Sequence, residues 1–169
     1  MQVIDLEKEI ISEFEMFDNW MEKYEYLIEL GKDLPLISSP HKSDENIIKG
    51  CQSRVWLHAE FEKDLVSFHA DSEAIITKGI IALLIRVLNN QSPKNILDAK
   101  LNFINEIGLT NHLSPTRANG LLEMVKQMKA YAYSLMIKNP FALDHYMVYV
   151  VYIIYRRQCL NSKHHFEWN

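Results

Sequence analysis

The sequence predicts an α+β fold, a compact single domain in which several helices pack on a small antiparallel sheet. Two observations predict it. Apolar residues recur at helical spacing along most of the 169 residues, whereas the period changes to two between residues 55 and 70. A domain of this length buries roughly two-thirds of its unfolded surface, which is enough for a core.

Two helices are expected before residue 32. Residues 3–16 and residues 20–28 each carry apolar side chains at helical spacing: Ile4, Ile10, Ile11, Phe14, Trp20, Tyr24, Leu27 and Ile28. Gly31 is predicted to stop the second helix. A polar loop with Pro35 and Pro40 follows and leads to residues 47–53.

A hairpin is expected next. Residues 55–61 alternate between apolar and mixed side chains, which is typical of a half-buried strand. Residues 62–64 can turn the chain, and Val66, Phe68 and Ala70 indicate an antiparallel return strand.

The remaining core is expected to be helical. Asp71 or Ser72 could cap a nearly all-apolar helix that ends near Asn89 and forms the centre of the core. Ser92-Pro93 and Ser114-Pro115 are helix-start signals, because serine caps a helix and proline suits its first position. The last of these helices is expected to end near Lys138.

The sequence is therefore divided into a domain over residues 1–138 and a C-terminal extension, residues 139–169, of unknown role. The extension is rich in tyrosine and β-branched residues up to Tyr155. A membrane helix needs about 20 apolar residues, and Asp144 and His145 interrupt this run. We expect an added strand or helix, or a poorly ordered appendage, and no membrane span.

Composition excludes several classes of protein. The formal net charge of −4 lacks the basic excess that nucleic-acid binding favours. Two cysteines without a CxxC motif do not form a disulfide framework, so a reducing compartment is expected. The acidic N-terminal residues do not resemble a signal peptide, and we expect a cytoplasmic protein.

Cys51 has the surroundings best suited to reactivity. It follows Gly50, where a loop meets a strand, so its backbone can adopt unusual conformations. Lys49 is a nearby cation, which would favour the reactive thiolate. Cysteines are also commonly small buried hydrophobic residues, and position alone leaves both readings open. Cys159, in the tail, is expected to be structural or incidental.

Other chemistry finds little support. The histidines are scattered, and no pair has a spacing that suits zinc on a helix, so no metal site is expected. A Cys–His centre that uses Cys51 is compatible with the spacing, although no protease signature surrounds it. Glycine-rich phosphate loops and nucleophile elbows are absent from the sequence, so no bound cofactor is expected.

Five blocks of sequence resemble one family. The run NIIKGCQSRVWL, residues 46–57, is similar to the GCQS-x-VW signature of SufE. Residues 19–24 and 29–35 resemble the family's N-terminal helix and its exit. Residues 70–74, with Lys78-Gly79, resemble the start of its core helix, and residues 112–121 resemble its C-terminal motif. The blocks follow the family's order over about residues 5–138.

The resemblance implies a fold like that of the scaffold protein IscU and a role in iron–sulfur cluster assembly. In the family, a pyridoxal-phosphate desulfurase (SufS) forms an enzyme persulfide from L-cysteine. SufE accepts that sulfur on its loop cysteine, here Cys51, stimulates the desulfurase and delivers the sulfur to the SufBCD scaffold. Pyridoxal phosphate would belong to the desulfurase, and this chain would be its sulfur-acceptor partner rather than a free-standing enzyme.

Alternatives within this resemblance stay open. The chain could serve another desulfurase, as the related CsdE serves CsdA, or activate a desulfurase non-covalently without transfer through Cys51. The oligomeric state, a homodimer included, is also open. Lys49, Gly50 and Gln52 are candidate supporting residues of the loop, and Arg117 matches a family position that could orient the loop or meet the desulfurase.

A persulfide carrier should also shield its sulfur from reductants. Trp56, Ile47 and Ile48 are candidates for an apolar wall against which Cys51 could retreat. Asp71 and Glu73 are candidates for the partner-facing region.

Overall fold

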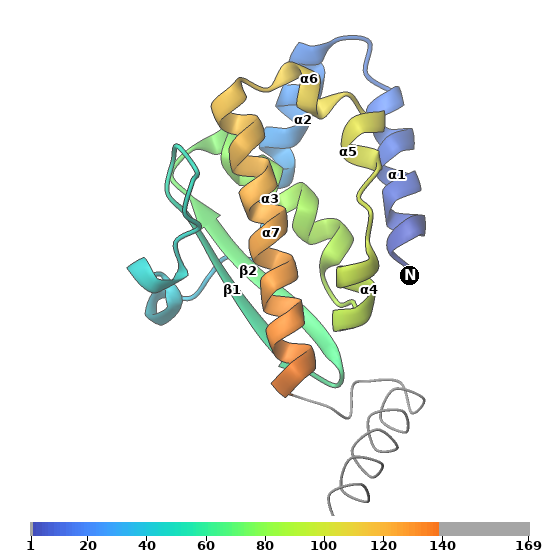
Figure 1. Cartoon of the computed structure of the whole chain (residues 1–169). Coiled ribbons are helices and arrows are strands. Elements are labelled where there is room, and N and C mark those ends of the chain that lie inside the picture. The colour runs from blue at the N-terminus through green and yellow to red at the C-terminus, as the bar shows by residue number, and fades with distance from the viewer. Residues whose placement is uncertain (1, 139–169) are drawn as a thin grey trace, which may run out of the picture.

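The computed structural model describes residues 2–138 and confirms the α+β fold (Figure 1). Within this part of the chain, the labelled helices lie to one side of one two-stranded antiparallel sheet. The helices and strands are α1 (Val3–Glu15), α2 (Trp20–Lys32), β1 (Val55–Glu62), β2 (Leu65–Ser72), α3 (Ile75–Leu88), α4 (Pro93–Asp98), α5 (Phe103–Glu106), α6 (Leu109–His112) and α7 (Pro115–Lys138). The predicted extension, with Cys159, lies outside the described residues.

The predicted antiparallel hairpin forms. Leu57 pairs with Ala70, and Ala59 pairs with Phe68. Lys63 and Asp64 make the turn with φ values of 52° and 63°, the positive φ at both central positions that a type I′ turn requires. This tight turn fixes which side chains face the helices.

The outward side of β1 is less exposed than simple alternation predicts. Trp56 is only 7% exposed, because the segment before β1 folds back over it. Ile47 forms an isolated antiparallel bridge with Trp56, and the Lys42 ammonium lies 4.6 Å from the centre of its indole ring. The loop that precedes Cys51 is therefore packed on the hairpin.

Helix α3 is the central core helix, as predicted. Its buried side chains include Ile81, Leu84 and Leu88, and it packs against α2, β2 and α7. In Figure 1, α7 runs along the hairpin in front of α3. The groove between α3 and α7 faces the loop that carries Cys51.

The predicted cap of α3 was wrong. Asp71 and Ser72 are still part of β2, and Ala74 occupies the N-cap position without a side-chain cap. The Asp71 carboxylate instead forms ion pairs with Lys42 at 2.6 Å and Lys78 at 2.8 Å. Burial favours the neutral carboxyl group, but hydrogen bonds from these two cations and from the Ser72 amide together hold the pKa of Asp71 below its ordinary value. Asp71 therefore links three segments rather than capping a helix.

Gly31 does not stop α2, which continues to Lys32. It lies where α2 crosses α3, opposite Gly79: a methyl group on Gly31 would come within 3.0 Å of the Gly79 backbone nitrogen. The two glycines allow the helix backbones to approach closely, so their role is packing.

The later helix starts follow prediction. Ser92 accepts a hydrogen bond from the Asn95 amide at 3.2 Å, and α4 begins at Pro93. Helix α7 begins at Pro115. A search of residues 2–138 finds no helix with the length and apolar content needed to cross a membrane.

Candidate functional site

Cys51 lies in the loop between a 3₁₀ turn (Asp44–Asn46) and β1. Gly50 has a φ of 88°, a conformation that L side chains rarely adopt. Two side chains of α7 hold the loop: the Asn119 amide donates to the Gly50 carbonyl, and the Thr116 hydroxyl donates to the Gln52 side-chain oxygen, each at 3.1 Å. The loop is attached to the first turns of α7.

The Cys51 sulfur points at the backbone of α7. Its thiol donates a weak hydrogen bond to the Gly120 carbonyl, with a sulfur–oxygen distance of 3.7 Å. A methyl group on Gly120 would lie 3.5 Å from this sulfur. The absence of a side chain at Gly120 therefore leaves space next to the thiol, which is half-buried.

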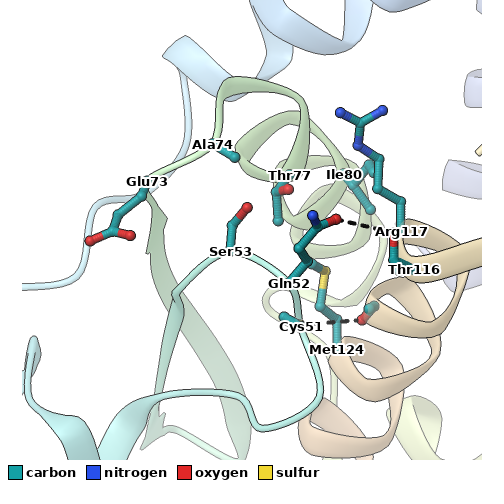
Figure 2. A pocket seen from close by; sticks show the side chains of 11 residues that line it. Cys51, Gln52, Ser53, Glu73, Ala74, Thr77, Ile80, Thr116, Arg117 and Met124 are labelled. Atoms are coloured by element: carbon teal, nitrogen blue, oxygen red, sulfur yellow. Dashed lines mark hydrogen bonds between the residues drawn. The ribbon is translucent and has the colours of Figure 1, made fainter. Parts of the chain in front are cut away.

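A cavity of about 380 Å³ opens beside Cys51, between the loop and helices α3 and α7 (Figure 2). Ile80 and Met124, both nearly fully buried, supply its apolar wall. Its lining consists of Cys51, Gln52, Ser53, Glu73, Ala74, Thr77, Ile80, Thr116, Arg117, Gly120 and Met124. None of these described lining residues is a histidine, so the arrangement offers no support for a Cys–His centre.

Most of the predicted site residues come together here, but Lys49 does not. Gln52 and Arg117 line the cavity, and Gly50 and Cys51 also border a second hollow together with Asn119. Lys49 lies in a different depression, with Ile47 and Ile48. Those two isoleucines and Trp56 are not in the cavity lining, so the predicted apolar wall was misplaced.

The expected activation of the thiol by Lys49 is also absent. Burial raises the pKa of the Cys51 thiol above its ordinary value, and the nearby Glu123 carboxylate raises it further. Both effects disfavour the thiolate, because neither a half-buried site nor a neighbouring anion stabilises a negative charge. In this conformation Cys51 is a sheltered thiol whose thiolate form is disfavoured.

Sequence reasoning missed Glu123, Gly120, Met124, Thr77 and Ile80. Gly120 carried a usable signal, because a glycine inside a helix often marks a close approach of another segment. The others lie on helix faces that resemble ordinary core or surface, and only the packing of α3 against α7 brings them to Cys51.

Replacement of Glu123 tests the electrostatics of the site. In Glu123→Gln, the pKa of Cys51 should fall, because the neighbouring negative charge is removed while burial stays the same. Iodoacetamide should then alkylate Cys51 faster than in the wild type at pH 7, a rate measurable by intact mass. Glu73→Gln is the matched control, since Glu73 lines the same cavity but is not a source of the shift. Equal alkylation rates for the Glu123 variant and the wild type would contradict this account.

Comparisons with known proteins show which family the chain resembles. The family model SufE, described as an Fe-S metabolism associated domain, matches residues 8–132. An uncharacterised SufE-like protein of Rhizobium meliloti is 38% identical over 130 residues, which cover 73% of this chain and 92% of that protein. A SufE-like protein 1 of Arabidopsis thaliana, named as chloroplastic/mitochondrial, is 39% identical over 133 residues, which cover 78% of this chain but 36% of the relative.

The fold has a counterpart among solved structures. The solution structure of a hypothetical protein from Thermus thermophilus matches with a TM-score of 0.66 and 20% identity, covering 78% of this chain and 96% of that one. The fold and the family match together define a small α+β protein associated with iron–sulfur metabolism. The chain belongs to the SufE family.

Proposed function

We propose that the chain is a sulfur carrier in iron–sulfur cluster assembly, with Cys51 as the residue that accepts the sulfur. The donor would be a SufS-like cysteine desulfurase, which the chain stimulates, and the recipient a SufBCD-type scaffold. The main support for this proposal is the position of the Cys51 thiol. It is half-buried, follows Gly50 in a loop, and lies at the edge of a cavity of about 380 Å³. A reactive but shielded sulfur needs such a position.

The proposed transfer is a thiol–persulfide exchange. The Cys51 thiolate attacks the outer sulfur of the desulfurase persulfide, the S–S bond of that persulfide breaks, and a new S–S bond forms on Cys51. The desulfurase cysteine leaves as a thiolate and takes up a proton, while the proton of Cys51 passes to solvent. One sulfur atom moves, and no external oxidant or reductant is needed.

The sheltered conformation suits storage better than attack. A thiol whose pKa is raised is mostly protonated at neutral pH and attacks slowly. We infer that the partner draws the loop away from α7, which breaks the contact with Gly120 and removes the sulfur from the influence of Glu123. Among the described residues, three neutral hydrogen bonds join the loop to α7, and each contributes about 1 kcal/mol.

The second candidate is a non-covalent activator of a desulfurase in which Cys51 transfers nothing. The raised pKa of Cys51 favours it, because the thiol in this conformation is a poor nucleophile. A CsdE-like pairing with another desulfurase uses the same chemistry as the first proposal and differs only in the partner.

Pyridoxal phosphate belongs to the desulfurase, residues 1–138 form the sulfur-acceptor domain, and the chain acts in the reducing cytoplasm. Arg117, exposed at the cavity, is a candidate contact for the desulfurase.

Intact mass spectrometry tests the proposal. The full chain is mixed with a SufS-like desulfurase, pyridoxal phosphate and L-cysteine, and its mass is measured without reductant. We expect a gain of roughly 32 Da, one sulfur atom, that dithiothreitol reverses. A wild-type chain that gains no sulfur under conditions in which the desulfurase itself carries a persulfide would contradict the proposal.

A further inference from the structure

We propose that His41, His58 and Glu60 form a binding site for a divalent transition-metal ion of the zinc class, on the outer side of the hairpin and away from the Cys51 cavity. This site is independent of the proposed sulfur transfer. It departs from the sequence-based expectation of no metal site, because its ligands come from two segments that only the fold brings together.

The three side chains are close enough to share one ion. One possible ligand atom from each lies within 4.8 Å of the others. His58 Nε2 and a Glu60 carboxylate oxygen are 3.9 Å apart. Two ligands on one tetrahedral zinc ion are about 3.3 Å apart, given bond lengths near 2.0–2.1 Å. Side-chain shifts of less than about 1 Å would therefore bring this pair into coordination.

The donor set suits this class of metal. Imidazole nitrogen with one carboxylate oxygen is typical of zinc and related ions, whereas magnesium and calcium prefer oxygen ligands alone. The His41 and His58 rings stack with their centres 3.7 Å apart. Each ring nitrogen binds a metal in the plane of its own ring, so shared coordination requires the two rings to turn out of this stacked arrangement.

Neighbouring groups can orient the ligands. The Ser38 hydroxyl lies 3.2 Å from His41 Nδ1, an arrangement that leaves His41 Nε2 for the metal. His69 pairs with His58 across the hairpin, and its Nε2 lies 3.8 Å from the second Glu60 oxygen. We assign His69 as a positioning residue for the carboxylate, the usual companion of a metal ligand.

An ion at this place would join the segment that precedes Cys51 to strand β1. His41 ends the 3₁₀ turn Ser39–His41, and His58 lies in β1. The segment between them contains Cys51, so an ion bound to both histidines would fasten the two ends of the cysteine-bearing segment. Figure 1 shows the two short 3₁₀ turns on the outer side of the hairpin. The Lys42–Trp56 contact already joins the same two segments.

Isothermal titration of the metal-free full chain with Zn²⁺ tests the site. We expect one ion per chain, and a loss of affinity of at least about tenfold in His58→Ala and in Glu60→Gln. Glu62→Gln is the matched control, because Glu62 lies exposed on the same strand but forms an ion pair with the exposed Lys63 and is not part of the cluster. Its affinity for Zn²⁺ should equal that of the wild type.

Two further measurements separate this site from other metal-binding groups of the chain. A His164→Ala/His165→Ala variant should keep the wild-type affinity. The Co²⁺-loaded chain should show no thiolate-to-metal absorption, because the ligands are nitrogen and oxygen. Far-ultraviolet circular dichroism verifies that each variant is folded. Absence of Zn²⁺ binding, unchanged affinity in folded Glu60→Gln, or loss of binding in the tail variant would overturn the proposal.

Discussion

Gly79→Ala is expected to lower the free energy of unfolding by about 3 kcal/mol or more. A methyl group at this position would lie 2.1 Å from the Leu27 carbonyl oxygen and 2.6 Å from its carbonyl carbon. Both atoms belong to the α2 backbone, so no side-chain rotation can relieve the clash. Overpacking of a well-packed core typically costs 1–3 kcal/mol of stability and occasionally more. A clash with backbone atoms should cost at least the upper value of this range, because the backbone cannot move aside as a side chain can.

Urea unfolding followed by circular dichroism measures this effect, with Gly120→Ala as the matched control. A methyl group on Gly120 meets its nearest atom, the Cys51 sulfur, at an ordinary 3.5 Å. Alanine is also favoured over glycine inside a helix by roughly 0.5–1 kcal/mol. The control should therefore be as stable as the wild type or slightly more stable. Equal stability of Gly79→Ala and the wild type would contradict the close crossing of α2 and α3.

Cys51→Ser is expected to abolish the stimulation of the desulfurase. Serine is close to cysteine in size and can still donate to the Gly120 carbonyl, so the loop should keep its structure. Its hydroxyl cannot form the S–S bond that removes sulfur from the desulfurase. Turnover, measured as alanine released from L-cysteine, should fall to the rate of the desulfurase without this chain.

The binding of Cys51→Ser to the desulfurase should be unchanged, and titration calorimetry provides that control. Retained binding with lost stimulation indicates a covalent carrier. Stimulation that persists in Cys51→Ser would instead support the non-covalent activator and sink the carrier proposal.

The sequence predicted the parts of the fold that depend on local signals. Alternation over residues 55–70 predicted the hairpin, and the serine–proline pairs predicted the starts of α4 and α7. The errors involve residues whose roles depend on distant neighbours. Asp71 has the right chemistry for a helix cap, but Lys42 and Lys78 bind it on the strand. Gly31 resembles a helix stop, but it packs against Gly79.

In the candidate site, too, features with a local sequence signal were predicted, and features that depend on distant residues were missed. The residue type and loop position of Cys51 were visible in the sequence, and so was the cation at Lys49. The charge that acts on the thiol is that of Glu123 on α7, and a position so far along the chain carries no local signal. The histidines also seemed scattered, because their clustering arises from the loop that folds back over β1.

Locating the added mass on the chain tests whether Cys51 is the residue that carries the sulfur. Wild type, Cys51→Ser and Cys159→Ser are each incubated with the desulfurase and L-cysteine, then measured intact without reductant. We expect a gain of roughly 32 Da on the wild type and on Cys159→Ser, and no gain on Cys51→Ser. A sulfur adduct that remains on Cys51→Ser, or that disappears from Cys159→Ser, would contradict it.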